Sequence, residues 1–213
     1  FFSFFSSLSA IFYLKSLKVK NISLSAILIS SSALISTPLG IIFFSESITL
    51  TKFFGILLIL SAVFIAKFRN PIFEKNHIFG LIAGIMFGVA YVVDKGIVQH
   101  IHPLIYIFWS FLMISILGFL IGFQNVINSL KNRKLPSFKF LIFSGIGYFL
   151  FNLFTFKAYR VGGEVGRIDA INTAYIFIII IFEYFILKHT RGITRKLIAS
   201  ALAALGVFIL GNL

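Results

Sequence analysis

A stripe of polar side chains on the apolar segment 166–187 is the most chemically informative feature of the sequence. On an α-helix with about 100° per residue, Asp169, Asn172, Tyr175 and Glu183 fall on one line. The rest of the segment is nearly all Ile, Ala and Phe. Carboxylates and amides are costly in hydrocarbon, so such a stripe should face a protein interior or a water-filled cavity. The pattern therefore predicts a solute-lining face, with Glu183 as a partner for a coupled proton or cation.

An alternative interpretation of the two acids stays open. Asp169 and Glu183 lie toward opposite ends of the segment, where charged groups meet the membrane interface. In this interpretation the two acids pair with Arg167 or Lys188 and do not line a solute-binding cavity.

Two other segments carry similar polar faces. Segment 140–156 presents Tyr148 and Asn152 with Ser144 and Thr155, and segment 22–44 presents Ser25, Ser32 and Ser36. Hydrogen bonding between helices is the simpler explanation for the Ser and Thr residues. Asn152 is the better functional candidate, because an amide needs up to about four partners.

Two aromatic residues extend the candidate site. Tyr91 and Trp109 can form aromatic walls for an apolar or cationic solute. They also lie near Asp94 and Pro103, where an interfacial aromatic belt is expected. The candidate solute-binding residues are thus Ser32, Tyr91, Trp109, Tyr148, Asn152, Asn172, Tyr175 and Glu183.

The residue types and their spacing do not predict an enzyme active site or a metal site. The chain has no cysteine, and its four histidines lie in or beside predicted loops. His100 and His102 are the only close pair, and an i, i+2 spacing is not that of a helical zinc motif. The sequence shows no phosphate-binding loop and no recognisable nucleophile motif. We therefore predict no metal, no cofactor and no catalytic residue.

The elements that must position these residues are transmembrane helices. The chain is 59% hydrophobic and only 12% charged, whereas a soluble domain carries roughly 25% charged residues. Apolar runs of about 20 residues recur between short polar stretches, which predicts an all-α polytopic membrane bundle of about eight helices. The expected spans are 1–14, 22–44, 51–66, 78–99, 103–123, 140–156, 166–187 and 195–213.

The basic residues favour one orientation of this bundle. The net charge of +13 could indicate nucleic acid, but the basic residues form short clusters between apolar runs, as in membrane loops. Loops near 15–20, 67–75, 131–139 and 188–196 hold most of the 19 Lys and Arg residues. The positive-inside bias then places these loops in the cytoplasm and the C-terminus outside.

An internal repeat is visible at a spacing of about 143 residues. Residues 15–19, Lys-Ser-Leu-Lys-Val, align with residues 157–161, Lys-Ala-Tyr-Arg-Val. Five helices lie between the two copies, an odd number, so the copies fall on opposite membrane faces. Inverted repeats are typical of secondary transporters with a midplane site between the halves.

The chain resembles the EamA-type permeases of the drug/metabolite transporter superfamily. The resemblance is carried by residues 12–15, 21–26, 38, 45–49 and 55 in the first half, and by 88–96, 193–194 and 206–207 in the second. It implies two inverted five-helix repeats, with residues 1–66 as the last three helices of the first, 67–77 as a connecting loop and 78–213 as the second. On this basis helices preceding Phe1 are expected. His189 or Thr190 stands where the second repeat usually has the acid that Glu46 supplies in the first.

The resemblance implies a secondary transporter or exporter of small organic metabolites in the prokaryotic cell membrane. The acid Glu183 in segment 166–187 suggests a proton or cation as the coupling ion. The resemblance also implies that both termini are cytoplasmic, which conflicts with the charge distribution. Two alternative functions stay open: a membrane assembly subunit, favoured by the glycine steps at Gly80, Gly84 and Gly88, and a lipid-modifying enzyme.

Overall fold

The computed structural model describes residues 2–19, 22–47, 49–67, 74–131, 137–172 and 193–211, together with Tyr175, Ile178, Ile179, Phe182 and Phe185. Every regular element in these ranges is an α-helix. Their bounds are α1 Phe2–Ser16, α2 Ile22–Ile29, α3 Ser32–Phe44, α4 Leu50–Lys67, α5 His77–Val98, α6 Pro103–Lys131, α7 Phe138–Arg160, α8 Val165–Asn172 and α10 Ile193–Gly211.

Four helical stretches within the described ranges are long and apolar enough to cross a membrane. They are Leu24–Phe44, which covers most of α2 and all of α3, then His77–Val98, Pro103–Gln124 and Phe138–Arg160. The stretch Leu50–Ala62 in α4 is apolar but shorter. The prediction of an all-α transmembrane bundle is confirmed. The expected span 166–187 is represented by α8 and isolated later residues, and Glu183 lies outside the described residues.

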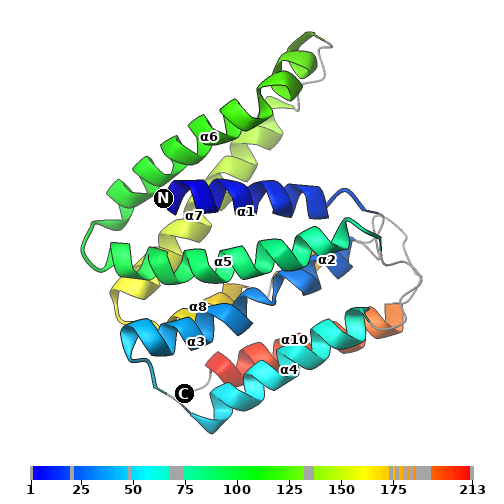
Figure 1. Cartoon of the computed structure of the whole chain (residues 1–213), viewed down its shortest axis with the longest axis vertical. Helices are drawn as coiled ribbons and strands as arrows, with labels where there is room; N and C mark the ends of the chain where they lie inside the picture. Colours follow the sequence, from blue (N-terminus) through cyan, green and yellow to red (C-terminus); the bar gives the residue numbers. More distant parts are fainter. Residues whose placement is uncertain are drawn as a thin grey trace.

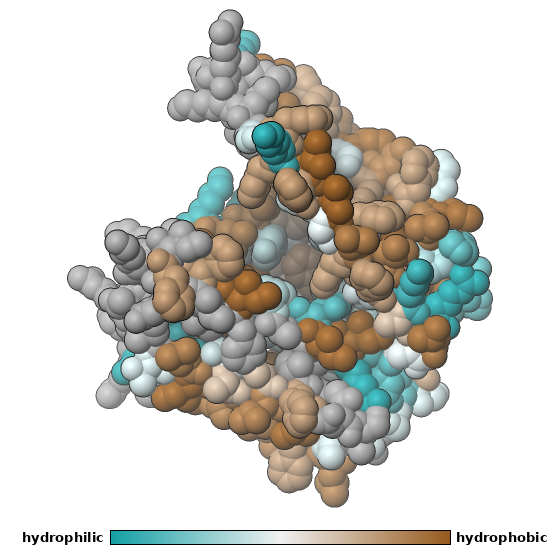
Figure 2. Space-filling view, turned by 180° about the vertical axis from the view of Figure 1, so that it is seen from behind, coloured by the Kyte–Doolittle hydropathy of each residue, from teal (hydrophilic) through white to brown (hydrophobic). Residues whose placement is uncertain are grey.

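The helices form three groups (Figure 1). The middle group holds α1, α5, α2 and α3, with α8 packed against α3. The helices α4 and α10 pack against each other on one side of it, and α6 and α7 project from the other side. Figure 2 shows a surface on which hydrophobic residues predominate and which is hollowed between two parts of the molecule. Lipid acyl chains are the natural partner of such a surface.

The expected span 22–44 is interrupted between α2 and α3. Pro38 lies inside this span and removes one backbone hydrogen bond, which commonly kinks or breaks a helix. The helix α3 instead runs through Pro38, and the break between α2 and α3 falls at Ser30 and Ser31. There the Ser31 amide donates to Leu28 O at 3.2 Å, one residue short of the helical partner. The Ser30 hydroxyl also donates to Ile27 O at 2.6 Å, which satisfies a carbonyl within the turn.

The glycine steps of α5 lie against this break. A Cβ atom at Gly84 would come within 2.5 Å of Ser31 Oγ and 2.7 Å of Ile29 O, and one at Gly88 within 2.6 Å of Ser32 O. Only hydrogen fits at these two positions, so α5 approaches the backbone of α2 and α3 directly. Gly84 and Gly88 therefore mediate close packing within the bundle.

Candidate functional site

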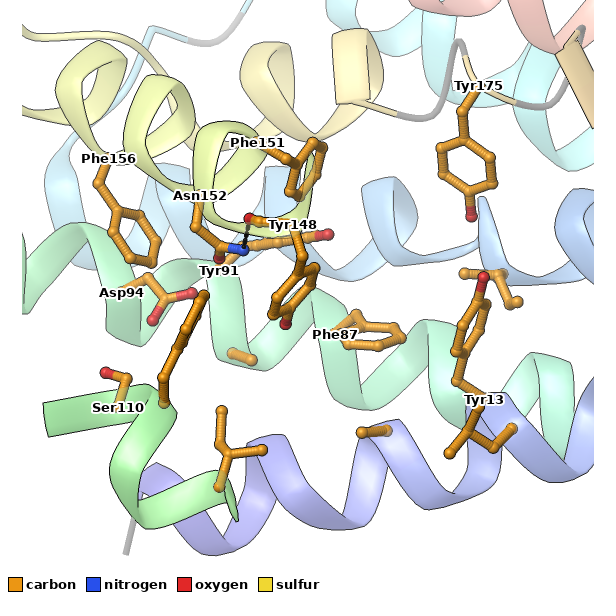
Figure 3. A pocket seen from close by; sticks show the side chains of 16 residues that line it. Tyr13, Phe87, Tyr91, Asp94, Ser110, Tyr148, Phe151, Asn152, Phe156 and Tyr175 are labelled. Atoms are coloured by element: carbon orange, nitrogen blue, oxygen red, sulfur yellow. Dashed lines mark hydrogen bonds between the residues drawn. The ribbon is translucent and has the colours of Figure 1, made fainter. Parts of the chain in front are cut away.

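A cavity of about 390 Å³ lies between α1, α5, α6 and α7. Its lining is mainly apolar, and half of the described lining residues are aromatic. Figure 3 shows Asp94 and Ser110 toward one end of the cavity and Tyr13 and Tyr175 toward the other. The lining residues are Ala10, Tyr13, Leu14, Ile29, Phe87, Ala90, Tyr91, Asp94, Ser110, Phe111, Ile114, Tyr148, Phe151, Asn152, Phe156 and Tyr175.

Two stacked aromatic pairs fix the orientation of rings in this wall. Phe87 and Tyr91, one helical turn apart on α5, have ring centroids 6.2 Å apart and an interplanar angle of 20°. Phe111 of α6 and Tyr148 of α7 are 5.1 Å apart at 22°. Offset stacking of this kind adds about 0.5–1.5 kcal/mol to the burial of the rings. The wall is thus built from mutually supported rings of three helices.

Asp94 supplies the only charged side chain among the described residues that line the cavity. Its Oδ1 atom accepts a hydrogen bond of 2.6 Å from the hydroxyl of Tyr106, which lies on α6. The residue is only 7% exposed. Lys95, its neighbour in sequence, lies on a different face of α5 and is directed at Glu46. Asp94 therefore presents a carboxyl group to the cavity, while the adjacent positive charge is held elsewhere.

Four of the candidate residues from the sequence lie in the cavity wall: Tyr91, Tyr148, Asn152 and Tyr175. The Asn152 side-chain amide donates to Tyr148 O at 2.8 Å, one turn earlier on α7 (Figure 3). This bond orients the side chain, and donor and acceptor capacity on the amide is left over. The structure thus brings together residues that the sequence placed on three separate helices.

Three other candidates lie elsewhere. Asn172 and Thr155 form a hydrogen-bonded pair between α8 and α7, with Nδ2 and Oγ1 3.2 Å apart. Ser32 donates to Asp169, as described next. Trp109 is 55% exposed on α6 and contacts Phe108 edge to face, on the outside of the bundle.

Asp169 is fully buried between α3 and α8. Its two carboxyl oxygens accept hydrogen bonds from Ser32 Oγ at 2.8 Å and Ser36 Oγ at 2.7 Å. The expected pairing of Asp169 with Arg167 is wrong, because Arg167 pairs with Glu164, while Glu183 and Lys188 lie outside the described residues. Ser32 and Ser36 act as the interhelical hydrogen-bond donors expected for serine in a membrane helix.

A second polar cluster lies where the α3–α4 connection meets α5 and the start of α8. Glu46 Oε1 is 2.8 Å from Lys95 Nζ and also accepts the Val165 backbone N–H at 2.8 Å. Val165 is the first residue of α8, so the carboxylate satisfies a free amide at the positive end of the helix. Lys95 Nζ also lies 4.8 Å from the centre of the Phe44 ring. Glu46 thus makes a helix-terminal contact as well as an ion pair.

A neighbouring ion-pair network is built around Glu164. Its carboxylate lies 2.9 Å from Lys52 Nζ and 3.1 Å from Arg167 Nε. Burial raises the pKa of Glu164, but hydrogen bonds from Lys52 and Ser47 and the charges of Lys52 and Arg167 outweigh this, so the pKa lies below its ordinary value. The network joins the N-terminal part of α4 to the α7–α8 connection.

Sequence reasoning missed Asp94 and Tyr13 as lining residues. Asp94 lies one turn before the end of α5, and its neighbour Lys95 suggested an interfacial position. Tyr13 follows a run of Phe and Ser with no polar periodicity. Residues adjacent in sequence lie on different faces of a helix. Asp94 and Lys95 could therefore have been assigned to different surroundings from the sequence alone.

An all-helical bundle, in the described ranges, with several membrane-length apolar helices and a cavity between them is the architecture of a polytopic membrane protein. The family model described as the EamA-like transporter family matches residues 75–212. The chain belongs to this family, and it is a multi-pass membrane transporter of the drug/metabolite transporter superfamily. No match was found among curated proteins or among solved structures.

Proposed function

We propose that this chain is a secondary transporter that moves small organic solutes across the cytoplasmic membrane of a prokaryote by alternating access. The observation that carries the proposal is the cavity between the two expected repeats. Four lining residues belong to residues 1–66, namely Ala10, Tyr13, Leu14 and Ile29, and the other lining residues belong to residues 78–213. A site shared by two inverted repeats is what alternating access requires.

Helix packing supports the division into repeats. In the expected register of about 143 residues, α2 corresponds to α8, and α4 corresponds to α10. The repeat-related helices α4 and α10 pack against each other. Elements related by a two-fold axis in the membrane plane meet in this way when they lie near the axis.

The polar clusters at Glu46 and Glu164 join the same two halves. The Glu46–Lys95 pair links the α3–α4 connection to α5, and the Lys52–Glu164 pair links α4 to the α7–α8 connection. If the halves rock about the cavity, these links hold them together on one side of the membrane in this conformation. They would separate when the cavity opens to that side.

Solute flux in proteoliposomes tests the proposal. The purified protein is reconstituted, and efflux of labelled amino acids, amines, sugars and nucleosides is measured. For any transported solute, Asn152→Ala should lower the initial rate about tenfold, since one hydrogen bond to solute is worth about 1.4 kcal/mol. Ser144→Ala, at an exposed position two turns earlier on the same helix and outside the cavity lining, is the matched control, because its hydroxyl donates to Leu141 O.

Two results would contradict the proposal. The first is the absence of flux for every solute of the panel in vesicles that contain folded protein. The second is full activity of Asn152→Ala for a transported solute, which would leave transport in place and remove the cavity as its site.

A further inference from the structure

The charge of the cavity wall is one-sided. Asp94 is the only ionisable acid or base, apart from tyrosine, among the described lining residues. No described basic residue forms an ion pair with it, and its hydrogen-bond donor is the neutral hydroxyl of Tyr106. The nearest basic residue in sequence, Lys95, is neutralised by Glu46 at 2.8 Å. The cavity therefore holds a carboxyl group that the protein does not balance.

The remaining wall is aromatic. Tyr91 lies one turn before Asp94 on α5, and Tyr148 and Asn152 face them from α7 (Figure 3). The partners Phe87 and Phe111 hold the rings of Tyr91 and Tyr148 by stacking. Rings fixed in this way present stable faces and edges to an occupant.

These two features favour one charge type. The face of an aromatic ring carries negative quadrupole potential and attracts a cation by about 0.5–2 kcal/mol, more strongly when water is excluded. A carboxylate in a low-dielectric cavity attracts the same cation and repels an anion. A neutral solute would leave Asp94 without a charge partner, so it would be bound only with the acid protonated or at a desolvation cost.

We infer that the cavity binds organic cations, that is, solutes with an ammonium nitrogen attached to an apolar body, with Asp94 as counter-charge and the Tyr91 and Tyr148 rings as walls. The inference rests on the proposed function, because it names the solute class of the same cavity. The cationic head lies toward the Asp94 end, and the apolar body extends toward Tyr13 and Tyr175.

Equilibrium binding with a probe set of similar shape tests the charge preference. The probe is radiolabelled benzyltrimethylammonium, bound to purified protein in detergent. Competitors are the unlabelled cation, its uncharged carbon isostere neopentylbenzene, and the anion phenylmethanesulfonate. We expect saturable binding that excess unlabelled cation displaces and that the anion does not. Displacement by the anion as effectively as by the cation, or absence of saturable cation binding, would overturn the inference.

Substitutions at Asp94 and Tyr91 test whether these two side chains bind the probe. Asp94→Asn keeps the shape and removes the charge, so the affinity for the probe should fall at least about tenfold. Asp169→Asn is the matched control, because Asp169 is a fully buried acid outside the cavity wall. Tyr91→Leu should weaken binding about 2- to 30-fold, while Tyr91→Phe, which keeps the ring, should stay within about twofold.

The folding of each variant is checked by its elution profile and thermal unfolding in detergent. If Asp94→Asn does not fold, the inference is tested by the competition series on the unmodified protein and by the comparison of Tyr91→Leu with Tyr91→Phe. Unchanged affinity in folded Asp94→Asn would overturn the inference.

Failure of this inference can be separated from failure of the proposed function. Flux of a neutral or anionic solute without cation binding overturns the cation preference and leaves the transporter. Saturable cation binding without flux of the cation or of any panel solute leaves the cation site and removes transport.

Discussion

Lys95 and Glu46 form a buried ion pair between α5 and the α3–α4 connection, with Nζ and Oε1 2.8 Å apart and both side chains at most 5% exposed. The same carboxylate oxygen accepts the first backbone N–H of α8. A residue 49 positions away in sequence thus provides the charge partner, and one 119 positions away provides the amide. One acid therefore fixes the mutual positions of three helices.

Removal of either member of this pair should destabilise the fold. Glu46→Ala leaves the Lys95 ammonium buried without its partner, which costs about 3–5 kcal/mol. The measurement is thermal or denaturant unfolding in detergent. Lys157→Met, at an exposed position on α7, is the control and should change the stability by no more than about 0.5 kcal/mol. The double variant Glu46→Ala, Lys95→Met should lose less than the sum of the single variants, and additive losses would contradict a direct pair.

The two serines that hold Asp169 give a second prediction. Ser36→Ala removes one of the two donors to a carboxyl group that is fully buried between α3 and α8. The free energy of unfolding should fall by about 1–3 kcal/mol, because a buried acceptor is left unsatisfied. Ser61→Ala is the matched control, since its exposed hydroxyl donates only to Leu57 O in its own helix. Equal effects of the two substitutions would show that the Asp169 contact contributes little.

The α5 glycines give a packing prediction. A methyl group at Gly84 would lie 2.5 Å from Ser31 Oγ and 2.7 Å from Ile29 O, so Gly84→Ala should destabilise the protein by about 1–3 kcal/mol. At Gly122 on α6 a Cβ atom meets nothing within 4 Å. Gly122→Ala should therefore be neutral or stabilising by up to about 1 kcal/mol, because alanine is the better helix former. The unfolding midpoints of both variants are measured in the same detergent. Equal midpoints would show that α5 is not tightly packed at Gly84.

The Glu164 network predicts a pH dependence of stability. The pKa of Glu164 is lower in the folded state than its ordinary value, so its ionised form is the one that folding favours. Its contribution is fully present above the unfolded pKa of about 4.3 and is lost as the pH falls through the lower folded value. The unfolding midpoints of the protein and of Glu164→Gln should thus differ near neutral pH and converge as the pH drops below about 4. A difference that stays constant over this range would exclude the ionised network as its source.

Part of the candidate site was predictable because it depends on helical periodicity alone. Tyr148 and Asn152 share a face of α7 through their i, i+4 spacing, and both line the cavity as that face predicts. The same reasoning placed Asp169, Asn172 and Tyr175 on one line of the next segment. The structure divides that line, because Tyr175 reaches the cavity while Asp169 and Asn172 bind α3 and α7.

The break in the second expected span shows the limit of local rules. Pro38 is the strongest local helix breaker in 22–44, yet the interruption lies at Ser30 and Ser31. Ser31 lies against Gly84 of α5, where only a hydrogen atom fits between the two helices. A contact between segments more than 50 residues apart cannot be read from the periodicity of either one.

The sequence by itself determined that the chain crosses the membrane as helices and which faces of those helices carry polar groups. Segment length and hydropathy decide this, because a backbone in lipid must satisfy its own hydrogen bonds within a helix. Only the tertiary structure decided that Asp94 faces the cavity while Lys95 turns to Glu46, and that Asp169 binds two serines of α3. The reason is that the partner of each charge lies on another helix, and its distance depends on how the helices cross.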